Sequence, residues 1–582
     1  MSWADRANHR TWLIETTSRG LWATTVIGML QYPLAAHATE PAQQPPASAP
    51  SPAATTPPAR PPAAPGNGAA AKPAPAFSIL EYQVEGNTVL RPIDVERAVT
   101  PYLGENKTIK DIEAARTQLE RVYHDHGYKT VQVNIPQQKI ADGVVRLAVT
   151  EGSVGKLKIA GSRYHSLQRI RDKLSQVQPG TVTNFPELQK EMGAVNRSDD
   201  LRITPILKAS DTPGHVDVEL DVQDQLPFHA MLDVNNRYSA NTTHLRTTGE
   251  LRYDNLFQDN QSFSFQYQVA PERLDDAKIW SASYVIPMGS RFVWALYAVH
   301  SDSNVASVGD LDVIGKGDIY GIRFITTLPT YDQSFYHSFT AGVDYKDFQQ
   351  NVVQSTGAIQ SPISYPPFTL DYSATWLGSA PTESGAPKAA TTGGRTSTNL
   401  DLGLSFLIQG LGTDAQQFAH KRAGAGTSYI ILHPSLWREQ VLPGNWSVYG
   451  KIDGQVASGP LINNEQYSAG GADTVRGYLE AERLGDNAAH ATVELRTPQL
   501  LAQRMAKVDQ SYVFLFSDIA RVTILEPLPG QQSGFNLASA GLGLRFKSRG
   551  FAVSLDGARI LKEGYLTPAG RFRGVFDVSY TY

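Results

Sequence analysis

The chain has 582 residues, enough for three or four domains, and its formal net charge of −4 gives no electrostatic reason to expect nucleic acid as a partner. Cysteine is absent, which excludes a disulfide framework, thiolate metal sites and a cysteine nucleophile. The 25 tyrosines, 21 phenylalanines and 8 tryptophans, against 6 methionines, favour a strand-rich protein.

The N-terminus has the pattern of a secretory signal. Three arginines precede the apolar run Leu21 to Leu34, and the small-x-small site Ala36-His37-Ala38 follows it. A buried helix is the alternative reading of this run. We expect cleavage after Ala38, so that residues 1–38 are a signal peptide, and a Pro/Ala-rich tether over residues 39–76, which cannot bury a core.

A first small module is predicted over residues 77–152. A strand with Tyr82 and Val84 leads into the turn Glu85-Gly86-Asn87, and a helix starts at Pro92. A second helix starts near Thr108, whose spacing to Asp111 is that of a capping box, and it ends at Gly127-Tyr128. Strands are expected at Thr130–Ile135 and Val144–Val149. His124-Asp125-His126 could be a metal site, but a solvated last helical turn explains it better.

The same order of elements repeats over residues 153–225. Leu157 and Ile159 alternate in a strand, a helix face follows, and Asn184-Pro186 opens another helix. Strands at Arg202–Ala209 and Val216–Val222 flank a Pro213-Gly214 turn. The two βααββ repeats resemble the POTRA module of outer-membrane assembly and secretion proteins, which implies a sheet edge where an extended client adds a strand. A stiff spacer without a client site is the alternative.

From about residue 226 to the end, helical spacing gives way to alternation. No stretch reaches the ~18 apolar residues of a membrane helix, so a membrane-embedded chain must cross as a closed barrel. Residues Ser262 to Val269 alternate without a fault, and the chain ends on Phe576, Val578, Tyr580 and Tyr582. A soluble β-sandwich would show the same period. The terminal aromatic resembles the C-terminal sorting signal of outer-membrane barrels.

The length of this region sets the expected architecture. About 350 residues at about 22 per strand and connection give roughly sixteen strands, and bacterial barrels have even numbers. The Pro/Ser/Thr/Gly-rich segment from about Gln354 to Arg395 is expected to be a loop, and long loops of such barrels are extracellular. The fold class is therefore mostly β: a 16-stranded antiparallel transmembrane β-barrel with two N-terminal α/β modules.

One motif interrupts the alternation. Val475-Arg476-Gly477-Tyr478 lies in a long loop between a strand at Trp446–Val456 and a strand at Ala491–Leu495. On the next strand, Tyr512, Phe514, Phe516 and Asp518 share the face opposite Val513, Leu515 and Ile519, so both faces carry apolar groups.

Such an aromatic row must be covered from inside the barrel. Arg476 is the expected partner of Asp518, since a guanidinium pairs bidentately with a carboxylate. Gly477 would allow close approach to the wall, and Tyr478 could pack on Phe514 or Phe516. An ordinary surface loop with an exposed aspartate is the alternative.

Val-Arg-Gly-Tyr followed by Phe-x-Asp on a strand resembles the transporter of two-partner secretion systems, over residues 77–582. This resemblance implies an outer-membrane translocase that secretes a partner exoprotein, an adhesin or haemolysin, with the POTRA modules in the periplasm and no ATP. Ala520 departs from the family's usual glycine, and the proline-rich residues 39–76 leave no place for the plug helix that many members carry.

Two other functions remain open: an insertase of outer-membrane proteins, and a non-translocating porin or surface-binding barrel. Gly541-x-Gly543 lies in an alternating strand and is not a nucleotide site. We expect no enzymatic activity, no cofactor and no metal. The expected partners are the secreted substrate at the POTRA modules, outer-membrane lipid and the barrel-assembly machinery, with the protein itself a monomer.

Overall fold

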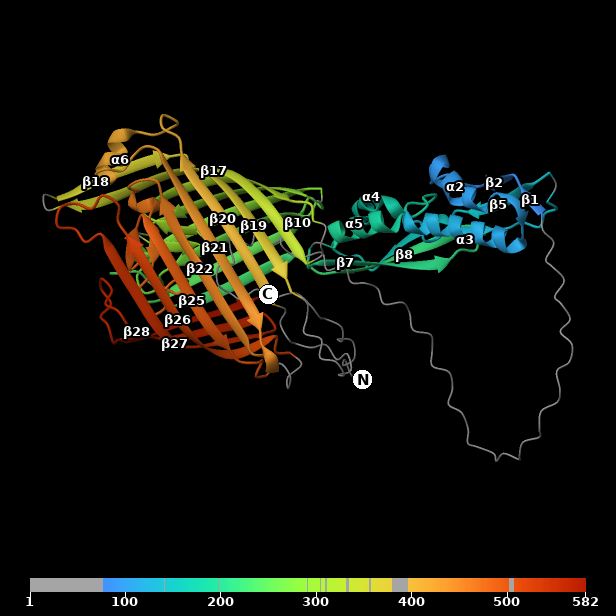
Figure 1. The fold of residues 1–582 in the computed structure, drawn as a ribbon. Coiled ribbons are helices and arrows are strands. Elements are labelled where there is room, and N and C mark those ends of the chain that lie inside the picture. The colour runs from blue at the N-terminus through green and yellow to red at the C-terminus, as the bar shows by residue number, and fades with distance from the viewer. Residues whose placement is uncertain are drawn as a thin grey trace, which may run out of the picture. The chain divides into compact units, whose positions relative to one another are not determined.

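The computed structural model describes residues 77–582 except 141, 197, 290, 304, 309–310, 331–333, 355–356, 379–395 and 502–506. The signal peptide and the tether predicted for residues 1–76 lie outside the described residues. The described chain forms two compact units, which meet in sequence at Gln225 and Leu226. Figure 1 shows helices in the first unit and long tilted strands in the second.

The first module contains the two helices and the three-stranded sheet expected from its sequence. Its elements are β1 (Phe77–Ile79), β2 (Glu81–Glu85), α2 (Pro92–Val99), η1 (Thr100–Tyr102), β3 (Gly104–Lys107), α3 (Ile109–Asp125), β4 (Gln132–Asn134) and β5 (Val144–Thr150). The sheet order is β2-β5-β4, with β2 parallel to β5. Thr108 and Asp111 form the capping box of α3. The additional ribbon of β1 with β3 was not predicted.

The second module repeats this arrangement. It consists of β6 (Ser153–Ala160), α4 (Leu167–Lys173), η2 (Ser175–Val177), α5 (Phe185–Val195), β7 (Leu201–Ala209) and β8 (His215–Asp224). Its sheet order is β6-β8-β7, again with one parallel and one antiparallel pair. Each module buries its own apolar core between the helices and the sheet. The rings of His124 and His126 lie at hydrogen-bond distance from the backbone carbonyls of Val131 and Val122.

The two modules meet where α3 ends and α5 begins. The backbone N–H of Phe185 donates to the carbonyl of Gly127 at 3.0 Å, and the Asn184 side chain donates to the carbonyl of His126 at 2.9 Å. A Cβ on Gly127, whose φ is +97°, would lie 2.7 Å from Cδ of Pro186. Close packing and two direct hydrogen bonds therefore connect the modules at this joint.

Residues 226–582 form a closed antiparallel barrel. Strands β18 and β19 share one position in its wall, because β18 pairs with the second half of β17 and β19 with the first half. The ring therefore has sixteen positions, as expected from the sequence. The wall consists of β9 (Phe228–Asn235), β10 (Arg246–Leu256), β11 (Gln261–Val269), β12 (Lys278–Met288), β13 (Phe292–Ser301), β16 (Gly317–Thr327), β17 (Phe335–Gln354), β18 (Gly357–Tyr365), β19 (Phe368–Leu377), β20 (Ser397–Leu407), β21 (Tyr429–Val441), β22 (Ser447–Ala457), β25 (Asn487–Arg496), β26 (Gln510–Thr523), β27 (Gly534–Ser548), β28 (Phe551–Ile560) and β29 (Phe572–Thr581).

The loop predicted for residues 354–395 is wrong in its first half. Residues 357–377 are the strands β18 and β19, and Pro366-Pro367 separates them. The non-local ladder with β17 overrides the loop-like composition, while the two prolines, which donate no hydrogen bond, break the strand. Residues 379–395, the second half of this predicted loop, lie outside the described residues.

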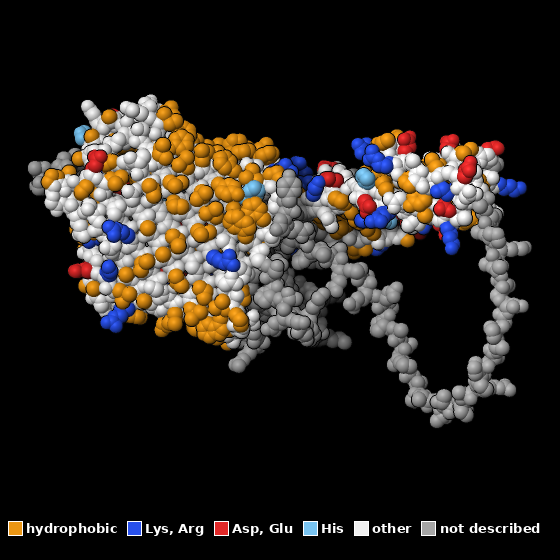
Figure 2. Space-filling view, viewed as in Figure 1, with side chains coloured by type: hydrophobic (Ala, Val, Ile, Leu, Met, Phe, Trp, Pro, Cys, Tyr) orange, Lys and Arg blue, Asp and Glu red, His pale blue; other side chains and the backbone are white. Residues whose placement is uncertain are grey.

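The barrel wall separates an apolar outer surface from a tightly packed inner surface. On β26 Val513, Leu515 and Ile519 are 36–56% exposed, whereas the alternate residues from Tyr512 to Val522 are at most 5% exposed. Figure 2 shows hydrophobic side chains spread over the visible face of the wall. This outward apolar band is what a lipid bilayer requires of a barrel. Among the described residues, no helix is both long and apolar enough to cross a membrane.

Asp224, at the end of β8, organises the loop between β6 and α4. Its side chain is 1% exposed and accepts backbone N–H bonds from Arg163, Tyr164 and His165 at 2.6–3.0 Å, and a hydroxyl bond from Ser162 at 3.2 Å. Burial alone would raise the pKa of this carboxyl, but the backbone hydrogen bonds outweigh it and hold the pKa below its usual value.

We predict that Asp224→Asn destabilises the arm of residues 77–225 by about 1–3 kcal/mol, because the neutral amide removes the charge that strengthens these hydrogen bonds and turns an NH2 group toward the Arg163 N–H. The folded-state pKa is depressed, so the stabilisation is complete above the unfolded value of about 3.9 and is lost as the pH falls through the folded value. Urea unfolding of the arm at neutral and acidic pH measures both effects. Asp211→Asn, at an exposed turn of the same module, is the control. An equal loss at neutral pH in both variants would contradict the prediction.

Candidate functional site

The connection between β22 and β25, residues 458–486, is called the lumen loop because it folds back against the inner side of the wall. It contains a short turn η5 (Asn463–Glu465) and a hairpin of β23 (Tyr467–Ala469) with β24 (Arg483–Gly485). Val475 and Arg476 are fully buried. A guanidinium with no exposure requires compensation by acceptors at every nitrogen.

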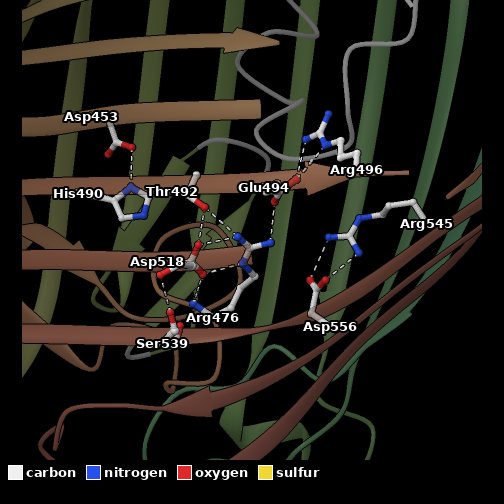
Figure 3. Close-up of polar contacts among 11 residues, drawn as sticks. Asp453, Arg476, His490, Thr492, Glu494, Arg496, Asp518, Ser539, Arg545 and Asp556 are labelled. Carbon is white, nitrogen blue, oxygen red and sulfur yellow. Dashed lines mark hydrogen bonds and ion pairs between the residues drawn. The ribbon is translucent and has the colours of Figure 1, made fainter. Parts of the chain in front are cut away.

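Arg476 receives that compensation from two neighbouring wall strands. Its backbone N–H and Nε donate to Oδ2 of Asp518 on β26 at 3.0 and 2.6 Å, and Nη2 donates to Oδ1 at 2.5 Å. Nη1 donates to Glu494 at 2.7 Å, and Nη2 also donates to Thr492 at 2.8 Å, both on β25. Figure 3 shows the guanidinium between these groups. The expected contact of Arg476 with Asp518 is therefore present, and the sequence reasoning missed Glu494 and Thr492.

An aromatic row supports the guanidinium from the wall. The centre of the Arg476 guanidinium lies 3.6 Å from the ring centroid of Phe516 and 5.8 Å from that of Phe514. A cation over an aromatic face in a site without water gains about 2 kcal/mol or more. Phe514 and Phe516 are at most 4% exposed. They thus fill the role expected of an inward row covered by the loop.

Gly541 and Gly543 make room for these rings. They face Phe516 and Phe514 across the β26–β27 ladder. A Cβ on Gly543 would lie 2.1 Å from Cζ of Phe514, and a Cβ on Gly541 would lie 2.7 Å from Cζ of Phe516. The Gly-x-Gly pattern in this strand therefore serves packing of aromatic rings across the wall.

Tyr478 lies elsewhere than expected. Its side chain packs in a separate apolar cluster with Ala520, Val522, Leu537 and Ile560, and not in the cluster that contains Phe514 and Phe516. Its hydroxyl donates to the carbonyl of Lys562 at 2.5 Å. Arg476 takes the place over Phe516 that sequence reasoning gave to Tyr478. Ala520, at the position of the family's glycine, is 5% exposed in the Tyr478 cluster.

Gly477 lets the loop approach the wall between these two side chains. Its φ is +94°, and a Cβ there would lie 2.8 Å from the Cβ of Ala558 on β28. Only glycine adopts this conformation at so short a distance without strain. Val475, Arg476, Gly477 and Tyr478 are therefore all in contact with the wall or its adjoining loops.

Two further ion pairs flank the site on the inner surface. Arg496 donates to Glu494 at 2.7 Å, so Glu494 is shared between a wall arginine and Arg476. Arg545 binds Asp556 with two parallel bonds of 2.8 and 3.0 Å, and its guanidinium lies 4.7 Å from the Phe514 ring centroid. The residues of these pairs occupy alternate, inward-facing positions on β25, β27 and β28. Which of them become partners can be predicted only once the strand register is known.

The C-terminal residues close the barrel. Phe576, Val578 and Tyr580 lie on β29, which pairs with both β28 and β9. The backbone N–H of Tyr582 donates to the carbonyl of Ala230 at 2.8 Å. Tyr580 and Tyr582 are 52% and 69% exposed. The terminal aromatics are thus free to face the bilayer or another protein.

A closed barrel of sixteen antiparallel strands, an arm of small α/β modules and an arginine loop held on the inner wall define an outer-membrane barrel of the POTRA class. A family model described as POTRA domain, ShlB-type, matches residues 77–152, and one described as haemolysin secretion/activation protein ShlB/FhaC/HecB matches residues 214–357 and 392–546. These matches span more than half of the chain, which therefore belongs to the haemolysin secretion/activation protein family. Its place is the bacterial outer membrane, with POTRA in the periplasm.

Individual relatives are distant. The outer membrane transporter CdiB of Escherichia coli is 23% identical over 235 residues, which are 40% of this chain and 39% of that protein. The solved structure of CdiB from Escherichia coli has a TM-score of 0.60 and 17% identity, covering 89% of this chain and 92% of that chain. BamA from Haemophilus ducreyi lacking POTRA domains 1–3 has a TM-score of 0.50 and 15% identity, covering 87% and 100%. The structural likenesses show a shared fold.

We predict that Gly543→Ala destabilises the folded barrel by about 1–3 kcal/mol, because its Cβ overlaps the Phe514 ring and forces the aromatic row to shift. The folded fraction is read from heat-modifiable migration on gels and from the urea midpoint in detergent. Gly574→Ala on β29 is the matched control, since no atom lies within 4 Å of its added Cβ. Equal midpoints for the two variants would refute this packing role.

Proposed function

We propose that this protein is a translocase that carries a partner exoprotein, of the adhesin or haemolysin kind, from the periplasm to the cell surface. The family membership supports this function, and so does the buried contact of Arg476 with Asp518, which holds a loop across the inside of the tube. Exported segments would bind unfolded to the POTRA modules at free sheet edges and pass through the lumen. The outer membrane transporter CdiB of Escherichia coli, a distant relative, agrees with this assignment.

The drive in this proposal comes from the cargo itself. A chain that enters unfolded and folds outside cannot return, because only the unfolded chain fits through the lumen and folding depletes it on the outer side. The translocase then needs no nucleotide, and the protein is no enzyme. Its own assembly would depend on the signal peptide of residues 1–38, on the aromatic C-terminus and on the barrel-assembly machinery, and it would act as a monomer.

Insertion of other outer-membrane proteins is the second candidate function, because BamA shares the fold at a TM-score of 0.50. A deletion strain separates the two. Loss of one or a few surface proteins, with an unchanged profile of outer-membrane barrels, is the result expected of an exporter. Depletion of many barrels at once would establish the insertase and refute the exporter. Loss of solute permeability alone would indicate a porin.

We predict that Asp518→Ala and Arg476→Glu each reduce secretion strongly while the barrel still assembles. Asp518→Ala leaves the backbone N–H and Nε of the buried Arg476 without an acceptor, and Arg476→Glu places a carboxylate beside Asp518 and Glu494. Each change costs about 3–5 kcal/mol, and the loop avoids this cost by leaving the wall. Secreted cargo is measured against barrel abundance in the outer membrane.

The matched control is Asp556→Asn, which weakens the neighbouring Arg545 pair between two wall strands. We expect this variant to secrete close to the normal amount. Normal secretion by Asp518→Ala would contradict the role of the Arg476 contact in transport.

A further inference from the structure

The lumen loop has a second set of contacts on a different part of the wall. Around the ring, β17 lies six positions from β26, beyond β25, β22, β21, β20 and the β18/β19 position. Glu465 of the loop reaches β17 and β18, whereas Arg476 of the same loop is bound to β26. The loop therefore spans the inside of the barrel from one side toward the other.

Three side chains make this second contact, which is called the far-wall anchor. The Lys346 ammonium on β17 lies 2.6 Å from Oε1 of Glu465, and the Tyr365 hydroxyl on β18 donates to the same oxygen at 2.5 Å. The side chains of Lys346 and Glu465 are 18% and 8% exposed. The Gln455 side chain on β22 adds a bond of 3.1 Å to the Glu465 carbonyl.

An apolar plug surrounds the far-wall anchor. Leu461 and Ile462, just before Glu465, are each 1% exposed and pack with inward residues of the wall. The cluster extends around the inner surface and consists of Ala270, Ala277, Ile279, Val299, Ile319, Phe348, Ile363, Tyr365, Leu407, Phe418, Tyr429, Ile431, Ala457, Leu461 and Ile462. These residues lie at the strand ends opposite to the start of β9, that is, in the extracellular half of the lumen. The loop segment thus packs against the wall in this half of the tube.

A loop from the mouth of the barrel covers the same segment. The helix α6 (Ala415–Lys421) inserts Phe418 into the cluster, with its ring centroid 5.6 Å from that of Tyr365. Arg422 then donates to the carbonyl of Leu461 at 2.6 Å and forms an ion pair with Asp486 at the end of the lumen loop. The plug therefore includes residues from two loops as well as the wall.

The two anchors differ in strength. The Arg476 side chain uses Nε and both terminal nitrogens, and it binds one carboxylate bidentately in the flat geometry that arginine favours. At the far-wall anchor both bonds fall on a single oxygen of Glu465, and the cation is a lysine, which acts as a point charge on a flexible stem. The far-wall anchor should therefore break before the Arg476 contact when the lumen loop is displaced.

We propose that Glu465, Lys346 and Tyr365 form a releasable anchor that keeps the extracellular half of the lumen closed. When this anchor opens, Leu461 and Ile462 leave the apolar cluster, while the contact of Arg476 with Asp518 keeps the rest of the loop on the wall. This inference rests on the proposed function for its biological purpose, but the closure itself is a property of the barrel without cargo.

The test is the conductance of the purified full-length protein in planar lipid bilayers. Glu465→Gln and Lys346→Met should each raise the open-to-closed ratio about tenfold, the effect of losing one charge-assisted hydrogen bond. The exchange of charges in Lys346→Glu with Glu465→Lys should return the ratio toward the original value. A double exchange as conductive as the single variants would overturn the ion-pair anchor.

The matched control is Asp344→Asn. Asp344 lies on the same face of β17, two residues from Lys346, and pairs with Arg323 of β16 at 2.6 Å. It tests for general loosening of the wall, so its conductance should stay at the original level. Equal increases in Asp344→Asn and Glu465→Gln, or no increase in either, would overturn the proposal.

Two further measurements keep the test decisive. Heat-modifiable migration on gels verifies that each variant is folded. If the charge variants fail to assemble, Tyr365→Phe replaces them, because it removes a single hydroxyl. An unchanged open-to-closed ratio in Tyr365→Phe would then count against the anchor. Secretion is scored separately. A barrel that gates as expected but exports nothing would refute the proposed function and leave this inference intact.

Discussion

The inner architecture depends on the neutralisation of one fully buried guanidinium. Arg476 has no exposure. Its position is tolerable only because Asp518, Glu494 and Thr492 accept its donors and the Phe516 ring centroid lies 3.6 Å from the guanidinium. The strands that carry these acceptors, β25 and β26, are neighbours, so the loop is bound to the inner face that they share. Other features follow from this contact, including the glycines that accommodate the aromatic rings and the close approach of Gly477. A porin with a water-filled interior has no need of such a covered apolar row.

The inside of the barrel is therefore divided between two kinds of packing. Near β25 to β28 the loop is bound by the buried charge of Arg476, whereas near β11 to β21 Leu461 and Ile462 pack on an apolar surface beside the ion pair of Glu465 with Lys346. Charged contacts have strict geometry and keep a segment in one place, and apolar contacts are less directional. A single loop that combines both can stay attached on one side while the other side is vacated. This combination suits a tube that must be closed at rest and wide in use.

Local patterns were sufficient to predict much of this structure. Alternation predicted the wall, the length of the alternating region predicted its strand number, and the spacing of Thr108 to Asp111 located a helix start. The Arg476–Asp518 contact was readable because the face of β26 was crowded with aromatic groups. The strands at residues 357–377 were missed, since their composition favours loops and only pairing with β17 orders them. The partners Glu494, Lys346 and Glu465 depend on register and on which strands face each other across the tube, and no local pattern encodes that.

The joint at Gly127, Asn184 and Pro186 has a consequence for any guest that touches both periplasmic modules. Once one stretch of an extended polypeptide is held by one sheet, the next stretch is kept close to the other sheet. The second contact is then intramolecular, with an effective concentration in the millimolar range for a short connecting segment. Two weak and individually unselective contacts add up to useful avidity, and either can let go without losing the guest. A bivalent grip of this kind suits a polymer that must advance in steps.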